Sequence, residues 1–259
     1  MDISDRDRDA FHPDYQQTKK TNASSSTSLS IAKVFLYMFI GLFITAVVAF
    51  GVGALVYYYA GVNPDAELAE SVLRTYFVIL IVSAIALFID MLIINFVIIR
   101  NGRSVLVPGI IYAVLVGVLF SMLTIVVDWR LIGMAFGVTA LVFLIMSVIA
   151  FLSKGNMNGL AIVIIGLAIG SGFLILFNWL FMLLTGTVLS TLYWVVTFAI
   201  FALVLFVTLF DLWRIKQIAE NGAMNNNIAL YCAFIMYTDF INVFIRILYF
   251  LIIIFGKRK

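Results

Sequence analysis

The stretch YTDFINVFIRILYFLIIIF, residues 237–255, is almost wholly apolar, yet it contains Asp239, Asn242 and Arg246. It is long enough to cross the hydrocarbon core of a bilayer as a helix, which takes about 20 residues. The three polar residues are spaced three and four apart and therefore share one face of that helix. Ionisable side chains at the centre of a bilayer cost about 2.5–3.5 kcal/mol each on insertion scales. We therefore expect this face to look into a helix bundle or a wet cavity and not at lipid.

The composition assigns the rest of the chain to the same environment. Of its 259 residues, 64% are hydrophobic and 11% are charged, and its mean hydropathy is +1.17. An ordinary soluble domain is about half apolar, so a soluble all-α protein is excluded as the leading interpretation. The net charge of +3 does not indicate a nucleic-acid partner, because the cations stand at the ends of apolar runs, as membrane topology requires.

Several kinds of site are excluded by residue counts. Cys232 is the only cysteine and His12 the only histidine, so the chain has no intrachain disulfide, no histidine-based metal site and no Ser-His-Asp or Cys-His pair. A glycine-rich phosphate loop is also absent. Two aspartates could serve an intramembrane aspartic protease, but the GxGD sequence of such enzymes is missing. We therefore expect no enzymatic activity and no cofactor.

Apolar runs of membrane-spanning length follow one another at regular spacing. A polar segment, residues 1–30, precedes them and is predicted to be a disordered cytosolic tail, because it has too few apolar residues to fold alone. Backbone groups in lipid must be satisfied within each segment, so the runs are helices. Residues 31–259 are thus predicted to form one all-α bundle of seven transmembrane helices, at about 34–60, 75–99, 105–127, 131–153, 159–184, 190–213 and 228–255.

The distribution of Lys and Arg predicts the orientation. With a cytosolic N-terminus, the cytosolic side collects most cations, including Arg214 and Lys216, which are interpreted as ordinary cytosolic anchors. The opposite side collects the acidic loop 63–70. The absence of a cleavable signal and the compact loops favour a bacterial inner membrane. Seven crossings, however, place the basic residues of 256–259 outside. Either the tail tolerates this position, or the last segment is re-entrant and returns to the cytosolic side.

Three aspartates lie within or at the ends of the apolar runs. Asp90 and Asp239 are deep in their runs, which favours a function over a structural ion pair, whereas Asp211 lies at the cytosolic end of the sixth run, where both interpretations are equally good. If two of these carboxylates share a site of low dielectric, they cannot both ionise cheaply and will share a proton. Such a pair would sense protons, and its ionised form would suit a hard cation such as Ca²⁺.

Five motifs, in order and spacing, resemble those of the Bax inhibitor family, also called transmembrane Bax inhibitor motif proteins. The resemblance covers about residues 31–256, with Asp90 standing where the family usually has Glu. The motifs are YTDFINVFIRIL (237–248), TLFDLWRIKQI (208–218), FGVTALVF (136–143), ILFNWLF (175–181, with Asn178) and Asp90 ahead of IIRNGR (98–103).

The resemblance implies a seven-helix fold with the last helix at the centre of the other six, and a pH-sensitive calcium leak. By this resemblance Asp211 and Asp239 form the pair that shares a proton and contacts Ca²⁺ transiently as the transported ion. Arg100 is the first candidate for an arginine that latches onto Asp211, and Arg103 is the second. Arg246 has no assigned role; it would neutralise Asp90 or narrow the pore.

Two further functions stay open at the level of sequence. Members of the family are also linked to stress survival and to restraining a membrane protease or another membrane partner, and the 30-residue polar tail is compatible with such a role. A secondary transporter for a small solute is the other alternative. Transporters often have helices broken by Gly or Pro in matching halves, and the few prolines in these runs, with Pro108 in the third, weaken that interpretation.

Overall fold

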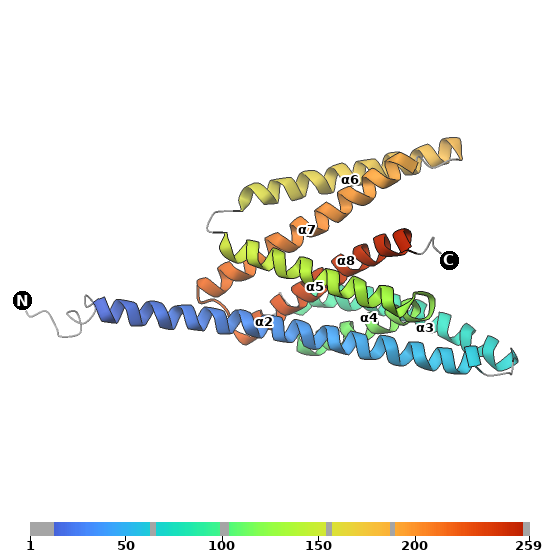
Figure 1. Cartoon of the computed structure of the whole chain (residues 1–259), viewed down its shortest axis with the longest axis horizontal. Helices are drawn as coiled ribbons and strands as arrows, with labels where there is room; N and C mark the ends of the chain where they lie inside the picture. Colours follow the sequence, from blue (N-terminus) through green and yellow to red (C-terminus); the bar gives the residue numbers. More distant parts are fainter. Residues whose placement is uncertain (1–12, 63–65, 99–103, 154–156, 187–189, 256–259) are drawn as a thin grey trace, which may run out of the picture.

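The structure, a computed structural model, describes residues 13–62, 66–98, 104–153, 157–186 and 190–255. Its described residues are helical with short connections (Figure 1). The helices are α2 (Pro13–Val56), the π-helical η1 (Tyr57–Val62), α3 (Ala66–Leu92), the π-helical η2 (Ile93–Ile98), α4 (Leu106–Val126), α5 (Trp129–Leu152), α6 (Asn158–Thr185), α7 (Ser190–Glu220) and α8 (Asn226–Phe255). Seven spans are long and apolar enough to cross a membrane, which confirms the predicted all-α bundle.

The first helix starts earlier than the apolar pattern suggests. Helix α2 begins at Pro13 and is 44 residues long, so it runs through residues 13–30, which were expected to be disordered. Extending a helix that already exists costs little compared with starting one, and proline is well suited to a first helical position. Residues 1–12 of the predicted tail lie outside the described residues.

Among the residues that the structure describes, the last helix has more buried residues than any other helix. It packs against α2, α5 and α7, and its ring contacts with Tyr112 and Phe120 join it to α4. Its central position among all six other helices stays a prediction. Its buried residues are Ala229, Cys232, Ala233, Met236, Tyr237, Asp239, Phe240, Val243, Phe244, Ile247 and Leu248.

Helices α2 and α4 approach each other closely along a seam of small residues. At Gly117 of α4, a β-carbon would lie 2.7 Å from Cβ of Val48 and 2.9 Å from the carbonyl oxygen of Thr45, both on α2. The Thr45 hydroxyl donates to the Ala113 carbonyl of α4 at 3.0 Å. Small residues and interhelical hydrogen bonds hold membrane helices together where lipid offers no hydrophobic drive.

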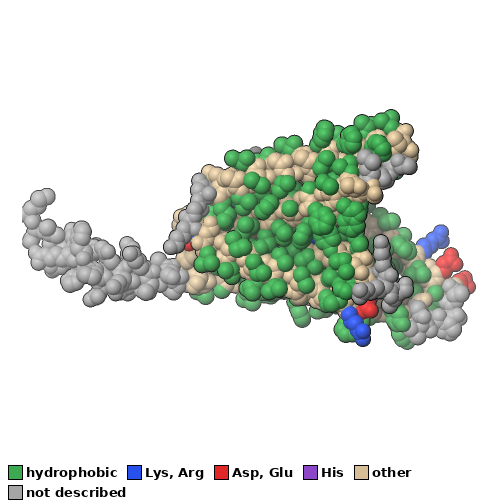
Figure 2. All heavy atoms as spheres, turned by 45° about the horizontal axis from the view of Figure 1, so that its top comes forward, with side chains coloured by type: hydrophobic (Ala, Val, Ile, Leu, Met, Phe, Trp, Pro, Cys, Tyr) green, Lys and Arg blue, Asp and Glu red, His purple; other side chains and the backbone are tan. Residues whose placement is uncertain are grey.

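Helix α6 lies at the edge of the bundle, beside α7 (Figure 1). Of its residues, only Ser171 is buried. Figure 2 shows the consequence at the surface: apolar side chains cover the body of the molecule, while the Lys, Arg, Asp and Glu side chains visible in this view gather mainly near one end. An apolar belt bounded by charged ends is the surface expected of an integral membrane protein.

The length of α8 favours a last segment that spans the membrane over one that is re-entrant. Asn226–Phe255 is one unbroken helix of 30 residues and meets the length and hydropathy expected of a full span. At about 1.5 Å per residue it is roughly 45 Å long, enough to cross the bilayer completely. The basic residues at 256–259 lie outside the described residues.

Candidate functional site

The site is built on the antiparallel pair formed by α7 and α8. The turn between them closes on Gly222, whose φ of 68° suits a residue without a side chain. Asn225 then caps α8 by accepting a hydrogen bond from the Ile228 amide at 2.8 Å. Asp211 lies roughly 14 Å before the end of α7, and Asp239 lies roughly 20 Å after the start of α8, at 1.5 Å per residue. The short turn therefore brings both aspartates to similar depths on adjacent helices.

Asp239 lies in the core. Its side chain is 7% exposed, and its Oδ2 atom has no hydrogen-bond partner among the described residues. The charge of Asp211 on α7 acts on it directly. Two carboxylates that face each other in a low-dielectric site repel when both are ionised. That the two carboxylates share a proton stays a prediction.

Asp211 is only half-buried, and its surroundings are more polar than those of Asp239. The exposed Arg214, one turn further along α7, acts electrostatically on Asp211. Both residues also act on Tyr231 and Cys232 at the start of α8. The described residues thus place a cation beside Asp211, from its own helix. Sequence reasoning treated Arg214 as an ordinary membrane anchor, although its i+3 spacing from Asp211 was a usable signal.

The two latch candidates are not tested by this geometry. Arg100 and Arg103 both fall in 99–103, outside the described residues, so their pairing with Asp211 stays a prediction.

Asp90 lies apart from this pair, on α3 one turn ahead of η2. It is 8% exposed, and its Oδ2 atom has no hydrogen-bond partner within the described parts of the chain. The group on which it acts is Tyr112 of α4, whose ring contacts Phe234 and Tyr237 of α8. Asp90 therefore lies within electrostatic range of an aromatic side chain that contacts the last helix. Short π-helical segments within helices often occur at functional sites.

The other predicted polar residues are distributed over three environments. Asn178 on α6 is half-buried, and its Oδ1 atom has no partner among the described residues. Arg246 is half-buried and acts on Tyr249, which contacts Tyr193 of α7 through its hydroxyl. Asn242 is exposed. Asp239, Asn242 and Arg246 thus do not share a fully buried face, because the exposed stripe of α8 passes through Asn242.

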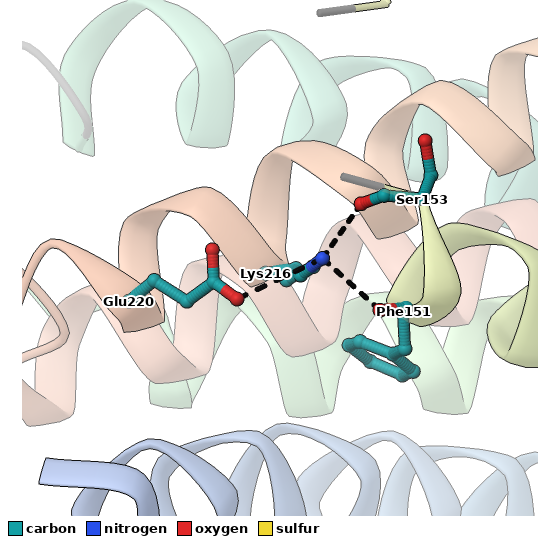
Figure 3. Close-up of polar contacts among 4 residues, drawn as sticks. All are labelled: Phe151, Ser153, Lys216 and Glu220. Atoms are coloured by element: carbon teal, nitrogen blue, oxygen red, sulfur yellow. Dashed lines mark hydrogen bonds and ion pairs between the residues drawn. The ribbon is translucent and has the colours of Figure 1, made fainter. Parts of the chain in front are cut away.

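Lys216 is a buried cation that sequence reasoning missed. It was interpreted as a cytosolic anchor, but it is 8% exposed. Its ammonium group donates to the Phe151 carbonyl at 3.0 Å and the Ser153 carbonyl at 2.7 Å, and lies 3.7 Å from the Glu220 carboxylate (Figure 3). These carbonyls end α5, where a cation is favoured by the helix dipole. The signal was its position on the buried stripe of α7 that includes Leu212 and Ala219.

A classical metal centre is not found in the part of the chain that the structure describes. No group of three or more His, Cys, Asp and Glu side chains comes together there. Asp211 and Asp239 offer two carboxylates, fewer than the six to eight oxygen ligands of a tightly held Ca²⁺. A transient contact of this pair with Ca²⁺ stays a prediction.

The match to a known protein family covers nearly all of the described chain. The family model described as "Inhibitor of apoptosis-promoting Bax1" matches residues 27–257. No curated protein and no solved structure matches the chain. The matched region includes all seven spans and every candidate site residue. The chain is an integral membrane protein with seven membrane-spanning helices, and it belongs to the Bax inhibitor family.

Proposed function

We propose that this protein is a pH-sensitive leak channel for Ca²⁺ and not an enzyme, with Asp211 and Asp239 as its proton sensor. One observation carries the proposal: Asp239, a buried carboxylate with an unpartnered oxygen, lies within electrostatic range of a second carboxylate, Asp211, on the neighbouring helix. An unpaired buried charge is costly and survives in membrane proteins mainly where it serves a function. The family match is consistent with a channel role.

The pair can switch because a proton changes the force between α7 and α8. When one proton is shared, the two carboxylates carry a single negative charge, and the helices can stay packed. When both ionise, they repel, and the site then has a net charge of minus two that attracts a divalent cation. Arg214 offsets part of the charge of Asp211, so Asp239 is the member of the pair whose ionisation is least compensated. An ion pair between Asp211 and Arg100 or Arg103 would likewise offset the charge of Asp211.

The test is Ca²⁺ flux into proteoliposomes across a series of pH values. Wild type is compared with Asp211→Asn and Asp239→Asn, and Glu67→Gln, an exposed acid in the first turn of α3, is the matched control. Both Asn variants should lose the pH dependence, because one titrating oxygen of the pair is replaced by an amide. The control should keep the wild-type profile.

Two outcomes would count against the proposal. A wild-type pH profile in Asp239→Asn would remove the aspartate pair as the sensor. No flux above that of empty liposomes at any pH would remove the channel itself. In that case the alternative of a regulator that binds a membrane protease or stress-response partner becomes the leading one, and a required N-terminal tail with dispensable aspartates would support it.

We place the protein in a bacterial inner membrane with its N-terminus in the cytosol, on the basis of the Lys and Arg distribution. Single cysteines in a Cys232→Ala background test this orientation. A cysteine at Ser71, near the start of α3, should react with an impermeant thiol reagent added outside intact cells. A cysteine at Asn221, after α7, should react only after the cells are opened. The reverse pattern would contradict the orientation.

A further inference from the structure

A second feature of the bundle, separate from the aspartate pair, is a cavity of about 400 Å³ enclosed by α2, α4, α5 and α8. This volume lies in the range of ordinary ligand pockets, about 300–1,000 Å³. Phe240 of α8, which is 2% exposed, forms part of its wall. Phe50 of α2 and Phe136 of α5 also line it and are 51% and 45% exposed. The cavity therefore reaches from the core to the outer surface of the bundle.

The threonine hydroxyls that line this cavity are not free to hydrogen-bond with water. Both are already used within the protein. Thr45 donates to carbonyls at Gly41 and Ala113 and shares a hydrogen bond of 2.6 Å with the Tyr237 hydroxyl. Thr124 donates to the Ser121 carbonyl at 2.7 Å. The remaining lining is glycine and apolar side chains. Apolar cavities stay dry unless an apolar group fills them, so the cavity provides no path for an ion.

The rim of the cavity has the chemistry of the membrane interface. Trp129, the first residue of α5, lines the cavity and is 70% exposed, and tryptophan is enriched at the level of lipid headgroups. The Arg130 guanidinium lies over its ring, 5.7 Å from the centroid. Asp128 is close by, and its Oδ1 atom accepts the Arg130 amide at 2.9 Å as the cap of α5. Arg130 does not itself line this cavity, but its contact with Trp129 places a cation next to the rim, with the Asp128 carboxylate close by.

We propose that this cavity is a phospholipid site, with one acyl chain lying between α2, α4, α5 and α8 and the lipid phosphate beside Arg130. The surrounding bilayer supplies phospholipid at high concentration, because the cavity opens on the apolar belt of the bundle. The dry lining matches an acyl chain, and the guanidinium matches a phosphate. The site does not depend on the aspartate pair or on a channel function.

Gly133 gives a direct way to close the site. It lines the cavity, and a β-carbon built there meets no atom within 4 Å, so a leucine side chain can extend into the space. Gly137, one turn along α5, has the same open surroundings and is not among the lining residues. Replacing either glycine by leucine favours the helix. Gly133→Leu should therefore fill part of the cavity, and Gly137→Leu is its matched control.

The experiment is photolabelling in vesicles of phosphatidylethanolamine and phosphatidylglycerol that contain a phosphatidylglycerol with a diazirine in the middle of one acyl chain. Labelled residues are located by peptide mass spectrometry. Wild type should be labelled at Phe240, which a lipid reaches only through the cavity, as well as at lipid-facing residues such as Leu144. Gly133→Leu should lower labelling of Phe240 by about tenfold, equivalent to about 1.4 kcal/mol of binding free energy. Gly137→Leu should not change it.

Labelling confined to outward-facing residues in the wild type would overturn the proposal, and this outcome does not depend on any variant folding. Equal labelling of Phe240 in Gly133→Leu and wild type would overturn it as well. A diacylglycerol with the same diazirine chain tests the phosphate contact. It should label Phe240 less than the phospholipid does, and Arg130→Gln should remove that difference. If the two lipids label Phe240 equally in the wild type, Arg130 does not hold the headgroup, and the proposed site is wrong.

Discussion

The ammonium group of Lys216 on α7 donates a hydrogen bond of 2.7 Å to the carbonyl oxygen of Ser153, the residue that ends α5. Together with its bond to the Phe151 carbonyl, this contact ties α5 to α7 one to two turns after Asp211. The last carbonyls of a helix have no partner within it, and Lys216 supplies one from a neighbouring helix. The contact fixes the position of the segment of α7 that carries the proposed sensor.

Removal of this cation should destabilise the bundle. In Lys216→Met the apolar stem is kept, but two partly buried carbonyls lose their donor, and an unpaired acceptor costs up to about 1–3 kcal/mol when it is fully buried. We expect a lower midpoint of thermal unfolding in detergent micelles. Lys33→Met, at an exposed position of α2, should leave the midpoint unchanged. An unaltered midpoint in Lys216→Met would show that the carbonyls are satisfied by other groups.

The hydroxyls of Thr45 and Tyr237 should be energetically coupled. They share a buried hydrogen bond of 2.6 Å between α2 and α8. Tyr237→Phe leaves Thr45 with its carbonyl partners, whereas Thr45→Val leaves the buried tyrosine hydroxyl alone and should cost more. Interhelical hydrogen bonds in membrane proteins couple by about 0.6 kcal/mol on average. A double-mutant cycle of unfolding free energies should give a coupling of that order, and a value of zero would show that the two hydroxyls act independently.

The number and type of the helices could be predicted from sequence, because each span is a long apolar run whose backbone must be satisfied internally. The predicted start of the first helix differs from the structure. Helix α2 extends back to Pro13 because propagation does not depend on apolar side chains. Within the candidate site, the pairing of Asp211 with Asp239 was implied by the resemblance of two motifs to those of the family, and it stays a prediction. The proximity of Arg214 to Asp211 follows from their spacing of three residues on one helix, which can be read from the sequence.

Other parts of the site depend on contacts between helices, which no local pattern reports. The burial of Lys216 follows from the position of the end of α5 against α7. The exposure of Asn242 follows from how α8 is rotated in the bundle, and a spacing of three or four residues does not set that rotation. Asp90 lies within electrostatic range of Tyr112 on α4, and Tyr112 contacts α8, a relation among three helices that are far apart in sequence.

Gly117 should tolerate no side chain, because α2 lies directly against it. Gly117→Ala gains roughly 0.5–1 kcal/mol in helix propensity. The added methyl group, however, must separate α4 from Val48 and Thr45, and overpacking of this kind costs about 1–3 kcal/mol. We expect a net loss of stability in steric-trapping or thermal measurements. Gly166→Ala on α6, where a β-carbon meets nothing within 4 Å, is the control and should be neutral or slightly stabilising. Equal stability of the two variants would contradict the close approach of α2 and α4.

Asp239 should limit the stability of the protein while serving its function. An ionised carboxylate with an unpartnered oxygen is expensive in the core, and a neutral amide of the same size is less so. At a pH where both carboxylates of the pair are ionised, Asp239→Asn should therefore be more stable than the wild type by about 1–3 kcal/mol. This difference should disappear at lower pH, where the pair holds its shared proton, and the variant should lose the pH response of Ca²⁺ flux. Asp128→Asn is the control, because asparagine caps a helix as well as aspartate does and this position is exposed. It should change neither property. A destabilised Asp239→Asn would show that the carboxylate has a stabilising structural partner, and the aspartate would then be a structural residue and not a sensor.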